Sequence, residues 1–365
     1  MRSRKWLAIA AAGALSVGAA ACGSNNDNKS SGGGGGSSAS GTVNGAGSTF
    51  AAPVYQQWGS DLKDKGITVN YQPVGSGAGV AALAQGTANF AGSDPALTSD
   101  DTKTLTKGKT VQIPMFFGAI TVAYNASGLD KGLKLDGKTV ADIFQGKITS
   151  WNDPAIASLN PGVKLPGGKI TVIHRSDESG TTKGFTTFLS DSSPEWKSKI
   201  GADKTVKWPT GTGAKGNDGV AAAIKQTDGA VGYVEQAYAL QNNFTVADVK
   251  NKAGKFIAPD LKSTSAAGDG VKVPKDLGIS TINAPGPTAY PITSQTFIDT
   301  YQDPCKSLGM SKGDAQALAG FISYGLGDGQ GALGQLFYAK LPSALLSKSQ
   351  AAAKSLTCNG APLGT

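Results

Sequence analysis

The sequence predicts an α/β fold made of two lobes. Short runs rich in β-branched residues alternate with Ala-rich helical runs, a pattern typical of α/β layers. Two stretches, 114–123 and 282–291, are interpreted as crossings between the lobes, and the second carries Pro285 and Pro287. One lobe would then comprise residues 42–118 and 285–365, and the other residues 119–284. Two lobes linked in this way are typical of proteins that close about a hinge.

The expected elements follow from hydrophobic periodicity along the chain. Strands are predicted at 68–74, 111–113, 120–124, 170–174 and 231–234, and helices at 80–85, 140–144 and 220–226. The tail, 312–356, is predicted to be helical, with breaks in the Gly-rich stretch 325–331. No fixed-period repeat is visible.

The N-terminal residues indicate export. A basic start is followed by an uncharged run, 6–21, that is too short to span a membrane. The run ends in Ala19-Ala20-Ala21-Cys22, which looks like a bacterial lipoprotein processing site, although Ala19 stands where Leu is usual. We expect a signal peptide over 1–21, a lipidated Cys22, and a Ser/Gly-rich flexible tether over 22–41. The protein would then be extracytoplasmic and anchored to the cell membrane, and ordinary cleavage near the Ala run is the alternative.

The charge of the chain bears on the class of ligand. The chain has 34 Lys and Arg against 26 Asp and Glu, which suits an anionic ligand but is equally explained by scattered solvated lysines. No dense basic run points to nucleic acid.

With Cys22 lipidated, Cys305 and Cys358 remain, and an even number in an exported protein predicts a disulfide. His174 is the only histidine and no Cys-x-x-Cys pair exists, so no metal or other cofactor is expected.

Three Gly-rich turns, each followed by a helical pattern, carry the candidate chemistry. They are Gly45-Ala46-Gly47-Ser48-Thr49-Phe50, Gly75-Ser76-Gly77-Ala78-Gly79 and Arg175-Ser176-Asp177-Glu178-Ser179-Gly180-Thr181. Such turns leave backbone N–H groups free at a helix start, where the helix dipole favours an anion. Each turn alone is explained as well by capping. Three of them together with Arg175 predict a site for a tetrahedral oxyanion.

Asp94 is an unexpected residue in this setting. Before Pro95 it fits an Asx-turn or a helix cap, which is its alternative interpretation. A carboxylate repels an anion unless the ligand still carries a proton to donate. Phosphate does so at neutral pH and sulfate does not, so Asp94 predicts selectivity for phosphate. Asp177, two residues after Arg175, is expected to orient the guanidinium.

At these residues the chain resembles the phosphate-binding subunit of bacterial high-affinity phosphate ABC transporters, the Pst system. The resemblance covers nearly all of the chain after the signal peptide. Further matching blocks are Trp151-Asn152-Asp153-Pro154, Leu159-Asn160-Pro161-Gly162, Gly232-Tyr233-Val234-Glu235, Ala289-Tyr290-Pro291-Ile292 and Phe321-Ile322-Ser323-Tyr324-Gly325-Leu326. It implies a two-lobed type II periplasmic-binding-protein-like fold with the ligand in the cleft between the lobes. It also implies a monomer that is not an enzyme, and permease subunits in the membrane as partners.

The resemblance also implies the role of each site residue. Phosphate would be bound by Thr49, Phe50, Ser76, Asp94, Arg175, Ser179, Gly180 and Thr181. Glu178 departs from the family pattern, which often has a small residue there, and Lys183 is the cation expected to offset its charge.

The sequence argues against two other functions. A binding protein for sulfate or molybdate would keep the helix starts but would not need Asp94. A phosphate-ester hydrolase lacks a Gly-x-Ser-x-Gly elbow and a set of metal ligands in this sequence. No catalytic residue is therefore predicted.

Overall fold

The computed structural model describes residues 40–94, 96–129 and 132–364, which fall in one compact unit. The predicted signal peptide and Cys22 lie outside the described residues. The predicted tether extends one residue too far, because Gly41 already begins the first strand, where it pairs with Ile67. Within the described ranges no helix is long and apolar enough to cross a membrane.

A mixed sheet organises the described part of the chain. Its strands are β1 (Gly41–Gly47), β2 (Ile67–Gln72), β3 (Phe90–Ser93), β4 (Thr110–Asn125), β6 (Thr171–Arg175), β7 (Thr212–Ala214), β8 (Ala230–Glu235), β9 (Thr245–Val246) and β12 (Thr293–Tyr301). Their order is β2-β1-β3-β12-β4-β8-β6-β7, with β9 also on β4. A second sheet has the order β11-β10-β5, made of β5 (Lys134–Leu135), β10 (Asp248–Lys250) and β11 (Phe256–Ile257). A third sheet pairs β13 (Thr357–Cys358) with β14 (Ala361–Pro362).

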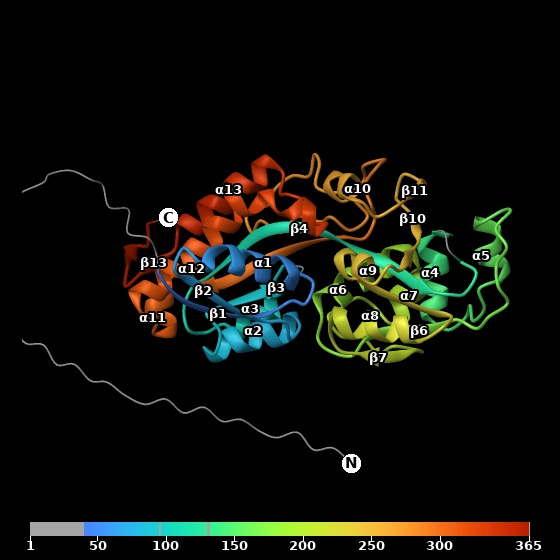
Figure 1. Cartoon of the computed structure of the whole chain (residues 1–365), viewed down its shortest axis with the longest axis horizontal. Helices are drawn as coiled ribbons and strands as arrows, with labels where there is room; N and C mark the ends of the chain where they lie inside the picture. Colours follow the sequence, from blue (N-terminus) through green and yellow to red (C-terminus); the bar gives the residue numbers. More distant parts are fainter. Residues whose placement is uncertain (1–39, 95, 130–131, 365) are drawn as a thin grey trace, which may run out of the picture. The chain divides into compact units, whose positions relative to one another are not determined.

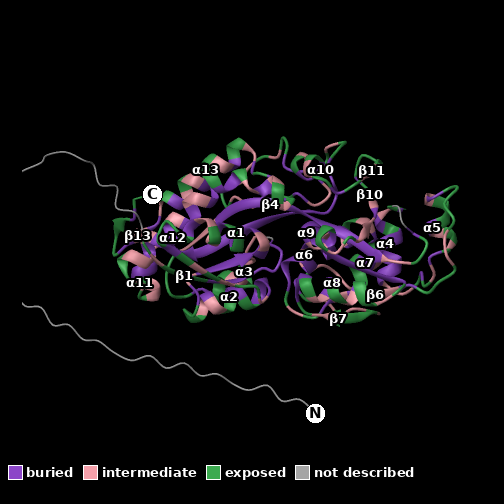
Figure 2. Ribbon diagram, in the orientation of Figure 1, coloured by how far each residue is buried: buried purple, intermediate pink, exposed green. Residues whose placement is uncertain are grey.

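Strand β4 joins the two halves of the large sheet. Its residues 110–119 pair with β12, and its residues 120–125 pair with β8. Figure 1 shows β4 running from the side that carries α12 and α13 to the side that carries α4 and α6, and Figure 2 shows it buried along most of its length. The two halves of the sheet are the centres of two lobes, as the sequence predicted.

The structure corrects the expectation of two separate strands around Pro114. Strand β4 is continuous over 16 residues, and the predicted crossing 114–123 is its middle. A proline is tolerated here because the pairing with β12 shifts register between Thr296 and Phe297, opposite Pro114. The shift leaves the next residue, Met115, outside the ladder, so the pairing is already irregular where the proline lacks its N–H group.

Helices cover both halves of the sheet (Figure 1). The first half carries α1 (Ala52–Lys63), α2 (Ser76–Gln85), α3 (Ser99–Thr104), α11 (Pro304–Leu308), α12 (Lys312–Gly325) and α13 (Ser343–Lys354). The second half carries α4 (Gly137–Phe144), α5 (Pro154–Leu159), α6 (Gly180–Ser192), α7 (Pro194–Lys199), α8 (Gly216–Gln226) and α9 (Gln236–Gln241). Helix α10 (Leu261–Ala266) and the 3₁₀ turns η1 (Asp328–Gly331) and η2 (Leu333–Leu336) complete the set. All three predicted helices and the helical tail with its Gly-rich break are confirmed.

Aromatic side chains fill the core of each half. In the first half Tyr55 makes edge contacts with Phe116 and Phe321, with ring centroids 5.8 and 5.9 Å apart. In the second half Tyr233 stacks on Phe185 at 4.3 Å. Each fully buried aromatic side chain stabilises the fold by about 1.5–3 kcal/mol. The site-forming turns are therefore attached to well-packed supports.

The predicted disulfide between Cys305 and Cys358 is confirmed. It joins helix α11 to strand β13 across 53 residues. Both cysteines lie in the first half of the fold, away from the predicted site turns. The bond therefore stabilises the C-terminal segment and contributes nothing directly to ligand chemistry.

Candidate oxyanion-binding site

The first two Gly-rich turns lie against each other. The first follows β1 and leads into α1, and the second begins α2, where Gly75 has a φ of +98° that favours glycine. The N–H of Gly75 donates to the carbonyl of Gly47 over 2.8 Å. Thr49 and Ser76 are both buried, so their hydroxyls lie in the interior of the protein.

The third turn comes from the other half of the sheet and meets the second. Ser179 caps α6 by accepting a hydrogen bond from the N–H of Thr182 at 3.1 Å. The next N–H, that of Gly180, donates to Oγ of Ser76 at 3.2 Å. The N–H of Gly77 donates in turn to the carbonyl of Glu178 at 3.2 Å. The starts of α2 and α6 therefore face each other across the lobes.

Gly180 also packs directly against Asp94. A Cβ atom at position 180 would lie 1.5 Å from the Asp94 carbonyl oxygen and 2.3 Å from its Oδ2, so no larger residue fits. The Asp94 carboxylate thus points toward the third turn. The sequence-predicted residues from both halves meet at one place.

Within the described part of the chain, one carboxylate oxygen of Asp94 has no hydrogen-bond partner. Its side chain is fully buried, Oδ1 accepts a hydrogen bond from Oγ1 of Thr296 at 3.2 Å, and Oδ2 has no hydrogen-bond partner among the described residues. Burial raises the pKa of Asp94 to about 6, against the opposing effects of the nearby Ser48 and Thr296 hydroxyls and of the Arg175 charge. A buried acceptor of this kind is costly unless something donates to it.

Arg175 and Asp177 form a two-pronged ion pair. The Arg175 side chain is almost fully buried, with Nε 2.7 Å from Oδ1 of Asp177 and Nη2 2.5 Å from its Oδ2. Burial opposes ionisation of Asp177, yet the hydrogen bonds and charge of Arg175 lower the pKa of that carboxyl below its usual value. The pair holds the guanidinium in a fixed plane, as expected, while Nη1 lies 3.4 Å from Oγ1 of Thr181.

Comparison with known proteins places this arrangement in a family. The PBP superfamily domain matches residues 33–328. A phosphate-binding protein PstS from Pasteurella multocida is 40% identical over 314 residues, covering 85% of this chain and 89% of that protein. A phosphate-binding protein PstS from Xylella fastidiosa is 39% identical over 313 residues, covering 85% and 84%.

The chain belongs to the PstS family of phosphate-binding proteins. A crystal structure of a phosphate-binding protein from Stenotrophomonas maltophilia has the same fold, with a TM-score of 0.66 at 22% identity over 86% of this chain and 94% of that one. The type II two-lobed fold is therefore confirmed for this PstS-family chain.

Sequence reasoning missed Asn217 as a component of the site. It is fully buried at the start of α8, and its Nδ2 donates to Oγ1 of Thr49 at 2.9 Å and to Oγ1 of Thr181 at 3.1 Å. The signal was present, because Gly216-Asn217-Asp218-Gly219 is a fourth Gly-rich turn that opens a helix. A search for all such turns would have found it.

Lys204, not Lys183, is the cation near Glu178. Lys183 donates to the carbonyl of Ala202 and lies 3.8 Å from Asp203, so the expectation that it offsets Glu178 was wrong. The ammonium group of Lys204 lies 3.7 Å from Glu178 and 2.5 Å from Asp101. Lys204 reaches Glu178 because the loop after α7 returns to the third turn. There the backbone carbonyl of Lys204 accepts a hydrogen bond from the N–H of Ser179.

His174 has a packing role in this PstS-family fold. Its ring stacks on Trp208 with centroids 4.7 Å apart, and Nδ1 lies 3.0 Å from the carbonyl oxygen of Arg175. Burial lowers its pKa. Among residues 40–94, 96–129 and 132–364, no group of three or more His, Cys, Asp or Glu residues is placed to hold a metal ion.

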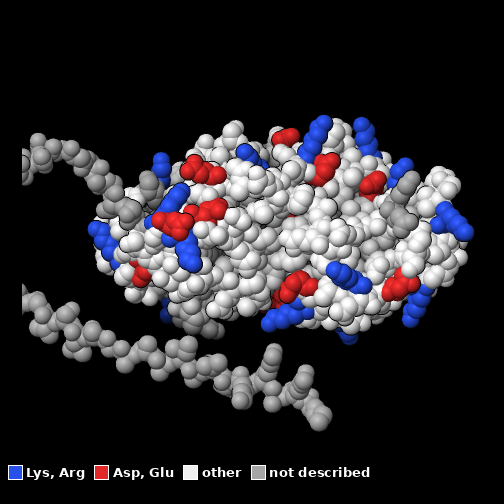
Figure 3. Space-filling model, in the orientation of Figure 1, with Lys and Arg blue, Asp and Glu red and all other residues white. Residues whose placement is uncertain are grey.

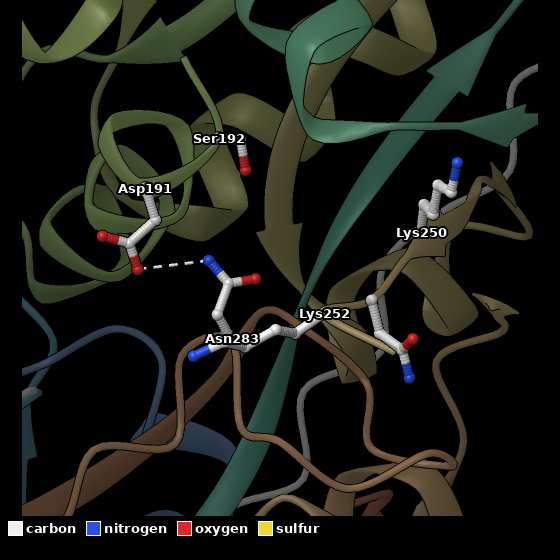
Figure 4. Close-up of a pocket in the computed structure, with 6 residues that line it drawn as sticks. Asp191, Ser192, Lys250, Lys252 and Asn283 are labelled. Atoms are coloured by element: carbon white, nitrogen blue, oxygen red, sulfur yellow. Dashed lines mark hydrogen bonds between the residues drawn. The ribbon is translucent and has the colours of Figure 1, made fainter. Parts of the chain in front are cut away.

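The open hollow drawn in Figure 4 is unrelated to the predicted residues. It has a volume of about 260 Å³ and is lined by Asp191, Ser192, Lys250, Asn251, Lys252 and Asn283. Its Asp191 accepts a hydrogen bond from Asn283 at 3.1 Å, and its charged side chains are exposed. On the face drawn in Figure 3, cationic and anionic side chains are intermixed, with no large basic patch.

Proposed function

We propose that this protein binds inorganic phosphate outside the cytoplasmic membrane and delivers it to the permease subunits of an ABC transporter. Its relatives are named as phosphate-binding proteins, and this supplies the ligand class. The observation that carries the proposal is the buried Oδ2 of Asp94, which has no hydrogen-bond partner among the described residues and lies against the start of α6, within reach of the charge of the buried Arg175. The ligand that suits this oxygen is an anion that still carries a proton and can donate a hydrogen bond to it.

The proposed ligand-binding residues are the eight expected from sequence, with Asp177 in support. Donors come from the first turn (Thr49, Phe50), the second turn (Ser76) and the third turn with its strand (Arg175, Ser179, Gly180, Thr181), and Asp94 accepts. A charge-assisted hydrogen bond contributes about 1.5–3 kcal/mol, so several of them support a micromolar or tighter Kd, which corresponds to about 8 kcal/mol.

Lobe boundaries and closure belong to the same proposal. We assign residues 42–118 and 285–365 to one lobe and residues 119–284 to the other, which is supported by the change of β4 partner from β12 to β8 at residues 119 and 120. Ser76 and Asp94 then lie on the first lobe, and Arg175 and Gly180 on the second. Ligand binding would close the lobes about β4 and the segment 282–291.

Calorimetric titration of the purified protein with phosphate, arsenate and sulfate tests the function. We expect phosphate and arsenate to bind with micromolar or tighter Kd and sulfate not to bind, because fully ionised sulfate has no proton for Asp94. Absence of phosphate binding at millimolar concentration would refute the proposal. Sulfate binding as tight as phosphate binding would favour a general oxyanion carrier instead.

We further propose that the protein acts as a monomer anchored by a lipid on Cys22. The support for the anchor is the processing context and the Ser/Gly-rich stretch that follows it, and the monomer is what the family resemblance implies. Cys22→Ala should release the protein into the medium or leave it unprocessed. Wild-type protein found mainly in the medium, with an N-terminus other than Cys22, would contradict the anchor.

A further inference from the structure

We infer that Asn217 is a positioning residue that fixes the direction of the hydrogen bonds in the site, so that Thr49 and Thr181 present their hydroxyl hydrogens to the anion. This inference rests on the proposed phosphate-binding function and adds a residue to it. Asn217 is fully buried and occupies the start of α8, on the lobe opposite Thr49.

The orientation of the Asn217 amide is fixed by a backbone donor. The N–H of Glu235 donates to Oδ1 of Asn217 at 2.9 Å. A backbone N–H cannot accept a hydrogen bond, so the oxygen of the amide must face it and the NH₂ group must face the other way. The nitrogen Nδ2 is therefore committed to donating toward the site.

Both hydrogens of that NH₂ group are used on threonine oxygens. One goes to Oγ1 of Thr49 at 2.9 Å and the other to Oγ1 of Thr181 at 3.1 Å. The backbone N–H of Asn217 donates to Oγ1 of Thr49 as well, at 3.1 Å. Because Thr49 and Thr181 belong to the first and third turns, one amide connects donors from both lobes.

The acceptor capacity of each hydroxyl is then filled. A threonine hydroxyl has two lone pairs and one hydrogen. Oγ1 of Thr49 accepts from the side chain and the backbone of Asn217, and Oγ1 of Thr181 accepts from Asn217 and, at 3.4 Å, from Arg175. The hydrogen of each hydroxyl is left to donate elsewhere. A chain of hydrogen bonds thus runs from the N–H of Glu235 through Asn217 to the two threonine oxygens, and it leaves the hydroxyl hydrogens for the proposed anion.

Asn217→Leu tests this role, because leucine has a similar volume and neither donates nor accepts. We expect the phosphate Kd to rise about tenfold or more, because the variant loses roughly one oriented hydrogen bond to the anion. Asn160→Leu is the matched control. Asn160 is also a buried second-lobe asparagine, bonded to the carbonyls of Lys134 and Ile156, and its replacement should lower stability but leave the phosphate Kd within about twofold.

A double-mutant cycle with Thr181→Val separates positioning from a general structural role. If Asn217 acts through the hydroxyl of Thr181, adding Asn217→Leu to Thr181→Val should weaken phosphate binding much less than it does in the wild type. A Kd for Asn217→Leu within twofold of wild type, or losses that multiply in the double variant, would overturn the inference. Failure of wild-type protein to bind phosphate would instead refute the proposed function, and this inference with it.

Discussion

Lys204 offers a sharp test of how the two lobes are held together. Its ammonium group, from the loop after α7, contacts Asp101 of α3 at 2.5 Å, and the two side chains are only 6% and 11% exposed. Burial opposes ionisation of Asp101, yet the hydrogen bond from Lys204 and those from Thr98 lower its pKa. We predict that Lys204→Met weakens phosphate binding because it removes this contact between the lobes.

The magnitude follows from what the substitution leaves behind. Removing one partner of a buried ion pair costs about 3–5 kcal/mol when the other charge is stranded. Asp101 keeps hydrogen bonds from the backbone N–H and the hydroxyl of Thr98, so the cost here should be smaller, about 1–3 kcal/mol. The cost falls on the closed state, so the phosphate Kd should rise by about 10- to 100-fold.

The assay is calorimetric titration of phosphate at fixed ionic strength, with Lys103→Met as the control. Lys103 pairs with Asp100 on the same helix, but those side chains are 73% and 84% exposed, and such pairs contribute about 0–1 kcal/mol. Lys204→Met combined with Asp101→Asn should recover part of the lost affinity, because no charge is then stranded. A Kd for Lys204→Met within twofold of the Lys103→Met value would refute the reasoning.

The remaining predictions concern selectivity and stability. Asp94→Asn should lose discrimination between phosphate and sulfate more than it loses phosphate affinity, so that sulfate binding appears in calorimetry. Arg175→Ala should weaken the binding of every oxyanion by a few kcal/mol. If Asp94→Asn still excludes sulfate, selectivity comes from another part of the site. Wild-type protein should also begin to bind sulfate as pH falls below about 6, where Asp94 gains its proton, and a sulfate affinity unchanged between pH 7 and 5 would contradict this. Burial raises the pKa of Asp299 to about 7, so the folded state holds this proton more tightly than the unfolded chain, and stability falls as pH rises from about 4 to 7. Asp299→Asn should therefore raise the unfolding temperature at pH 8 and not at pH 4, measured by calorimetry; an equal change at both would show that its charge is not the cause. Cys305→Ser should cost about 2–4 kcal/mol in urea unfolding without changing the phosphate Kd, and a tenfold weaker Kd would show that the disulfide shapes the site.

Much of the fold could be predicted because its signals are local. The strand and helix patterns, the Gly-rich helix starts and the cysteine count each depend on neighbouring residues. Strand β4 was divided wrongly because Pro114 looks like a break, and its tolerance depends on a register shift opposite β12. That information lies in the pairing of distant segments, which no single stretch of sequence carries.

The candidate site could likewise be predicted only where its signals are local. The eight expected residues are hydroxyl, backbone and charged groups in recognisable turns, and the structure brings their turns together. Asn217 and Lys204 were missed as contributors because their roles depend on partners far along the chain, such as Thr49 and Asp101. Glu178 could be recognised as unusual, but its neutralising cation could not, since the path of the loop after α7 decides it.

A crystal structure of the protein with phosphate at neutral pH tests the central claim most directly. The account predicts phosphate between the lobes, with one of its oxygens about 2.5–2.7 Å from Oδ2 of Asp94, as in a short O–H···O⁻ hydrogen bond, and with the Arg175 guanidinium on the anion. Phosphate bound elsewhere, or bound between the lobes with Oδ2 of Asp94 turned away from it, would contradict the account.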